Sequence, residues 1–137
     1  MKINALAVAG IAALGVYAVP AVAHHSFAMF DAEKTATLQG SVKEFQWTNP
    51  HAWIVLNVPN QQGQAEQWAI ELNGPSALVR DGWKPKTLTP GMNVSVTIHP
   101  LRDGTNGGQF LKVKLPDGTE MGRGGIERAP AATPPAP

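Results

Sequence analysis

From residue 24 onward, apolar and polar residues alternate in five segments, as they do in half-buried β-strands. In the segment MNVSVTIH, for example, Val94, Val96 and Ile98 fall on one face and polar residues on the other. Five strands are therefore predicted, at residues 35–47, 51–58, 66–72, 92–99 and 109–115.

Turn-forming residues separate these segments, and one short helix lies among them. Thr48-Asn49-Pro50 predicts a turn after the first strand, because proline cannot continue a central strand. Residues 75–81, PSALVRD, favour a helix that Gly82 can end. Three strands, a helix and two strands are typical of an all-β protein with an OB-fold-like, five-stranded barrel. A small β-sandwich is the alternative.

The first 23 residues have the three parts of a secretory signal peptide. Lys2 supplies the positive charge, residues 3–19 are uncharged and largely apolar, and Ala21-Val22-Ala23 follows Pro20. A membrane anchor is the alternative, but the apolar run is barely long enough to span a bilayer and no basic cluster follows it. We expect cleavage after Ala23, export to the periplasm and no stable membrane insertion afterwards.

The expected domain organisation is one barrel domain at residues 24–121, followed by a tail at residues 122–137. The tail, GRGGIERAPAATPPAP, is rich in Gly, Pro and Ala and has almost no large apolar side chain. Such a segment cannot bury enough surface to offset its ordering entropy, so we expect it to be flexible.

Charge and cysteine content narrow the possible partners. The chain has 11 Lys and Arg residues and 10 Asp and Glu residues, and Lys2 lies in the signal peptide. The mature chain is therefore close to neutral, which argues against nucleic acid as its partner. It contains no cysteine, so no disulfide stabilises the fold in an oxidising compartment.

Several motifs in this order resemble a family of small secreted bacterial proteins, domain of unknown function 6152. They are HHSFAMFD after the signal, LQGSVKEFQWTNPHAWIVL, WAIELNGPSALVRDGW, and the PG…V…DG…G pattern at residues 90–108. The resemblance covers roughly residues 24–118 and implies an envelope protein with a small β-barrel. It implies no activity, so function has to be argued from the residues.

The histidines are the main candidates for chemistry: His24, His25, His51 and His99. If cleavage follows Ala23, the α-amine and Nδ1 of His24 form a chelate that one further imidazole completes as a copper site. Nitrogen-rich, tetragonal ligation favours Cu(II). The α-amine, with a pKa of about 7.7 to 8.0, loses its proton readily to a metal near neutral pH.

His51 and His99 lie at the ends of predicted strands, where side chains ring a barrel mouth. We expect all four histidines to converge if the residues after the signal fold over that mouth. Met29 and Met121 offer thioethers that suit Cu(I). The alternative is that the terminal histidines are a flexible end and that His51 and His99 only make local hydrogen bonds.

A metal-free role is the second hypothesis, in which the barrel binds a small ligand or a protein. Of the four tryptophans, Trp53 and Trp68 are expected in the core, whereas Trp47 is expected to line a ligand groove. We do not expect an enzyme: there is no cysteine nucleophile, no serine in a nucleophile-elbow pattern and no phosphate-binding glycine loop. A copper oxidase is the third possibility.

Overall fold

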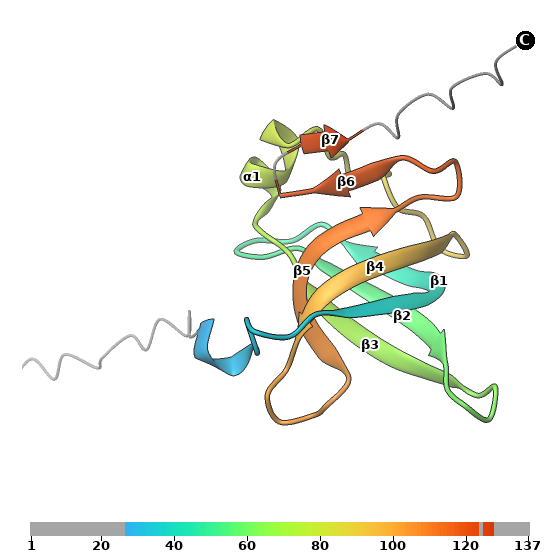
Figure 1. Cartoon of the computed structure of the whole chain (residues 1–137). Helices are drawn as coiled ribbons and strands as arrows, with labels where there is room; N and C mark the ends of the chain where they lie inside the picture. Colours follow the sequence, from blue (N-terminus) through green and yellow to red (C-terminus); the bar gives the residue numbers. More distant parts are fainter. Residues whose placement is uncertain (1–26, 124, 128–137) are drawn as a thin grey trace, which may run out of the picture.

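The computed structural model describes residues 27–123 and 125–127, which form a β-barrel (Figure 1). Its strands are β1 (Ala36–Gln46), β2 (Trp53–Pro59), β3 (Ala65–Glu71), β4 (Asn93–Pro100), β5 (Gly107–Lys114), β6 (Glu120–Gly122) and β7 (Gly125–Glu127). A 3₁₀ turn, η1 (Phe27–Met29), precedes β1, and one helix, α1 (Pro75–Arg80), lies between β3 and β4. The segments predicted from the alternation agree with β1 to β5 to within two residues.

The strands form one sheet in the order β3-β2-β1-β4-β5-β6-β7, in which β3 also pairs with β5. The β3–β5 pairing is parallel and the other pairings are antiparallel, so strands β1 to β5 form a closed, mixed barrel. Closure confirms the predicted OB-fold-like barrel and excludes the sandwich of two separate sheets.

The long strand β1 belongs to both halves of the barrel. Residues 36–41 pair with β4 and residues 41–46 pair with β2, with a bulge between Val42 and Glu44. Gly40 lies where β1 passes close to β2, because a Cβ there would meet the Asn57 carbonyl oxygen. The glycine thus permits the close packing that the bend of β1 requires.

Inward-facing side chains fill the barrel. Helix α1 and Trp83, which follows it in the chain, close one end. Leu78 on α1 and Trp83 after it are 3% and 1% exposed. The Trp83 ring meets Phe110 edge-on at a centroid distance of 5.4 Å and Phe45 at 5.9 Å. As predicted, Gly82 follows the helix with a positive φ of 85°. The end cap is therefore aromatic and well packed.

Strands β6 and β7 extend the sheet beyond the barrel. Sequence patterns did not predict them, and β7 lies within the segment expected to be a flexible tail. Met121 pairs with Ile126 and Gly122 with Gly125 in an antiparallel ladder. Backbone pairing requires no large side chain, so a segment with few apolar residues can still add a short strand.

Candidate functional site

Two of the four histidines, His51 and His99, fall in the described part of the chain. His51 lies in the connection from β1 to β2, and His99 lies on β4 just before the connection to β5. In an OB fold these two connections flank the usual ligand-binding face. His24 and His25 lie outside the described residues.

His51 is held by the end of β3. Its Nδ1 lies 2.9 Å from the carbonyl oxygen of Leu72 and 2.9 Å from Oε1 of Glu71. A carbonyl oxygen can only accept, so Nδ1 carries the proton and Nε2 holds the lone pair of the neutral ring. The His51 and Glu71 side chains are 25% and 22% exposed, so water screens their interaction only in part.

The turn that carries His51 is fixed on both sides. The Thr48 hydroxyl donates to the His51 carbonyl oxygen at 2.8 Å. On the other side, the turn packs against Gly74 at the start of α1, where a Cβ would lie 2.5 Å from the Pro50 carbonyl oxygen. His51 therefore has little freedom to move toward a ligand.

His99 is held by the segment that precedes β1. Its Nδ1 lies 2.7 Å from the carbonyl oxygen of Lys34. As at His51, the carbonyl makes Nδ1 the donor and leaves the lone pair of the neutral ring on Nε2. Metal-bound histidines commonly have this arrangement, in which the second ring nitrogen donates to a carbonyl or carboxylate.

Residues 27–34, which we call the lead-in, pack along the end of β4 (Figure 1, blue). Phe30 forms an isolated bridge with Leu101 and is 6% exposed. The Arg102 amide donates to the Met29 carbonyl oxygen at 2.9 Å, and the Asp31 amide donates to the Pro100 carbonyl oxygen at 2.8 Å. The first described residues after the signal segment are thus attached to the end of β4.

The carboxylate of Asp31 adds an electrostatic contact to this attachment. Lys34 Nζ lies 3.0 Å from Oδ2, and Arg102 Nη1 lies 4.0 Å from Oδ1. The hydrogen bond and charge of Lys34, with help from the Glu33 amide and Arg102, hold the pKa of Asp31 below its ordinary value. The carboxylate therefore favours the attached lead-in when it is ionised.

One row of outward-facing residues joins the two histidine environments. Strand register places Trp53 opposite Glu71, Glu71 opposite Gln109, and Gln109 opposite His99. Neighbouring strands lie about 4.8 Å apart, so His99 is roughly 10 Å of backbone spacing from Glu71. Within the described residues, no group of three or more His, Cys, Asp or Glu side chains could hold a metal ion.

The other predicted candidates lie as follows. Met121 is 4% exposed and belongs to the hydrophobic core, so its thioether is not a ligand at the barrel mouth. Met29 is 48% exposed and lies in the lead-in. Trp47 is half-buried against the core and meets Phe45 edge-on at 5.6 Å.

Two tryptophans differ in their positions relative to the core. Trp68 packs against the core, as expected from the sequence. The expectation that Trp53 does the same is wrong. Trp53 is half-buried on the outer face and pairs with Glu71. Ile54 and Leu56, both 0% exposed, are the inward residues of β2, so Trp53 falls on the opposite face of the alternation.

Sequence reasoning missed Glu71 and Gln109 as neighbours of the histidines. Their contacts depend on the parallel β3–β5 pairing, which joins segments far apart in the chain. The Gly107-Gly108 pair was the available signal. A Cβ at Gly107 would lie 2.7 Å from a Leu101 methyl group, and one at Gly108 would lie 2.6 Å from the His99 carbonyl oxygen. These glycines allow β5 to close the barrel beside His99.

Comparison with known proteins places the chain in a family. In the described residues, no helix is long and apolar enough to cross a membrane. A search of curated proteins finds no match. A solved structure that resembles the chain is the mitochondrial single-stranded DNA-binding protein Rim1 of S. cerevisiae, with 13% sequence identity and a TM-score of 0.47. The match covers 61% of this chain and 93% of that protein, and the likeness concerns the barrel fold alone. The profile of a family of unknown function, DUF6152, matches residues 12–110, and the chain therefore belongs to this family.

Proposed function

We propose that the chain is an exported, periplasmic binding module that holds Cu(II) at its mature N-terminus. The ligands are the α-amine and Nδ1 of His24 together with Nε2 of His99. His25 supplies a further imidazole beside them. Copper is the cofactor or cargo of this module, and no catalytic step is assigned to it.

The observation that carries the proposal is the hydrogen bond from His99 Nδ1 to the Lys34 carbonyl oxygen, 2.7 Å long. It ties the lead-in to His99 and orients the ring with its lone pair on Nε2. Phe27 is three residues from His24, a chain length of at most about 10 Å. The proposal requires the terminal amine to reach the same ion as His99 within that length.

His99 is a better third ligand than His51 because of what holds each ring. His51 Nδ1 interacts with both Leu72 and Glu71, and its turn packs against Gly74. These contacts explain the position of the His51 ring without a metal ion. The lead-in, by contrast, is attached beside His99, at Pro100, Leu101 and Arg102.

The test is a Cu(II) titration of the processed protein beside a variant with one alanine added before His24. The extra residue abolishes the chelate between the terminal amine and the His24 ring. We expect an affinity loss of about tenfold or more, which corresponds to about 1.4 kcal/mol, and a changed Cu(II) EPR spectrum. Equal affinities and identical spectra would overturn the proposal, as would a mature N-terminus other than His24.

The second candidate function is a metal-free module that binds a small ligand or a protein on the outer face of β2 and β3. Trp53 lies half-buried on this face, and its strand neighbours there include Val55 and Ala69. An indole that is partly exposed beside small apolar groups can stack on a ring-containing ligand. This function predicts ligand-dependent quenching of Trp53 fluorescence without copper, lost in Trp53→Phe and retained in His99→Ala.

A further inference from the structure

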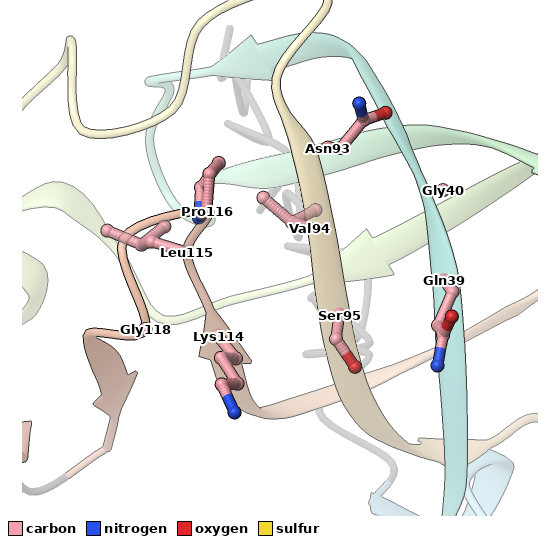
Figure 2. A pocket seen from close by; sticks show the side chains of 9 residues that line it. All are labelled: Gln39, Gly40, Asn93, Val94, Ser95, Lys114, Leu115, Pro116 and Gly118. Atoms are coloured by element: carbon pink, nitrogen blue, oxygen red, sulfur yellow. The ribbon is translucent and has the colours of Figure 1, made fainter. Parts of the chain in front are cut away.

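A hollow of about 480 Å³ lies on the outer face of β1, β4 and β5 (Figure 2). Gln39 of β1 and Asn93 of β4 form one side, and Lys114 with the β5–β6 hairpin forms the other. Gly40 and Ser95, which have small or no side chains, also line it. Val94, Leu115 and Pro116 add apolar surface, so polar and apolar side chains both line the hollow.

A second hollow of about 220 Å³ adjoins the first. Ser95 and Lys114 line both of them, so they form one groove. The second hollow adds Thr37, Thr97 and Lys112, and Glu120 closes its far side. We call the whole surface the polar groove.

Strand register explains why these side chains gather. Opposite residues on paired strands point to the same face. Thr37 pairs with Thr97 and Thr97 with Lys112; Gln39 pairs with Ser95 and Ser95 with Lys114. Two parallel rows result, each with neutral hydrogen-bonding groups on β1 and β4 and a lysine on β5. The residues between them, including Leu38, Val96 and Val113, are buried in the core.

The charges in the polar groove are not balanced. Lys112 Nζ lies 3.5 Å from Oε2 of Glu120, whereas Lys114 makes no ion pair in the described part of the chain. Asp117, in the hairpin nearby, does not line either hollow, and its carboxylate accepts a hydrogen bond from the Thr119 amide at 2.9 Å. The Lys114 ammonium group, without an ion pair in the described residues, therefore stands between a row of hydroxyl and amide groups and Glu120, its register partner on β6.

We propose that the polar groove binds an anionic sugar, a saccharide that bears a carboxylate or a phosphate group. The Lys114 ammonium group pairs with the anion, because charge-assisted hydrogen bonds are the strongest available on this face. Thr37, Thr97, Ser95 and Gln39 both donate and accept hydrogen bonds, which matches the hydroxyl groups of a sugar ring. The groove shares no lining residue with the proposed copper site and does not depend on it.

The test is an NMR titration of the ¹⁵N-labelled protein at constant ionic strength. The probes are galacturonate, glucose 6-phosphate, galactose and inorganic phosphate. At least one anionic sugar should cause saturable shifts at the amides of Gln39, Ser95 and Lys114, with clearly weaker binding of galactose. Lys114→Gln should weaken binding about fivefold and Ser95→Ala about threefold, as expected for partly exposed polar contacts.

Lys84→Gln is the matched control, since Lys84 is an exposed lysine outside the groove. It should leave the affinity unchanged. The two sugars also distinguish a carboxylate-bearing from a phosphate-bearing ligand. The proposal is wrong if neither anionic sugar causes saturable shifts at the groove, or if Lys84→Gln weakens binding as much as Lys114→Gln. It is also wrong if inorganic phosphate binds as tightly as both anionic sugars, because the hydroxyl rows would then contribute nothing.

Discussion

The His51 and His99 rings make the same kind of hydrogen bond at Nδ1, but different parts of the chain surround them. Each ring donates from Nδ1 to a backbone carbonyl oxygen, of Leu72 for His51 and of Lys34 for His99. His51 also faces the Glu71 carboxylate within the barrel wall, whereas the carbonyl at His99 belongs to the lead-in. The same hydrogen bond thus stabilises a turn in one place and attaches the N-terminal segment in the other.

The surroundings of His51 should therefore contribute to stability, and those of His99 to the proposed copper binding. Changes near His51 should destabilise the fold and leave copper binding intact. Changes near His99 and the lead-in should weaken copper binding more than stability, apart from changes to the buried anchor Phe30.

The largest effect should come from Phe30→Ala. Phe30 is 6% exposed and joins the lead-in to Leu101, so its truncation removes buried apolar contacts. We expect the free energy of unfolding to fall by about 3 kcal/mol, as measured by urea denaturation. Met29→Ala, at a neighbouring position that is 48% exposed, is the control and should change it little. A loss below about 0.5 kcal/mol for Phe30→Ala would mean that the lead-in does not belong to the cooperative fold.

Gly74→Ala should destabilise the His51 turn by about 2 kcal/mol, because the new Cβ would lie 2.5 Å from the Pro50 carbonyl oxygen and force the turn away from α1. Thermal or urea unfolding measures the loss. Ser76→Ala, an exposed position on the same helix, should have almost no effect. If Gly74→Ala also weakened Cu(II) binding, the claim that the copper site is independent of the His51 turn would be wrong.

His51→Ala and His99→Ala form a matched pair with smaller effects on stability. Loss of the half-buried contacts of His51 with Leu72 and Glu71 should reduce the free energy of unfolding by about 1 kcal/mol. His99→Ala should cost no more than that, yet it should weaken Cu(II) binding. Reversal of this order in the copper titration would assign the third ligand to His51.

Asp31→Asn should have the smallest effect, and the effect should depend on pH. Lys34 holds the pKa of Asp31 below its ordinary value of 3.8, so the ionised carboxylate contributes stability above that pH. This contribution is lost as the pH falls through the lowered pKa. The unfolding midpoint of Asp31→Asn should therefore lie slightly below that of the parent at pH 6, and the difference should shrink as the pH falls below 3.8. Glu33→Gln, an exposed neighbour, should match the parent at pH 6.

The sequence alone predicted much of the fold because alternation is a local property. Five segments, the helix and the stop at Gly82 follow from neighbouring residues. The site depends on pairings that are not local. Glu71 meets His51 across 20 positions, and Gln109 links Glu71 to His99 only after the barrel closes. Trp53 was misplaced because apolar residues lie on both faces of β2, so alternation alone does not show which face turns inward.

Pulsed EPR of the Cu(II)-loaded, processed protein with His99 or His51 replaced by alanine tests directly whether His99 is the third copper ligand. This method detects the remote nitrogen of each copper-bound imidazole. We expect His99→Ala to lose the signal of one imidazole and His51→Ala to match the parent. An unchanged spectrum for His99→Ala, or a loss in His51→Ala, would contradict the account.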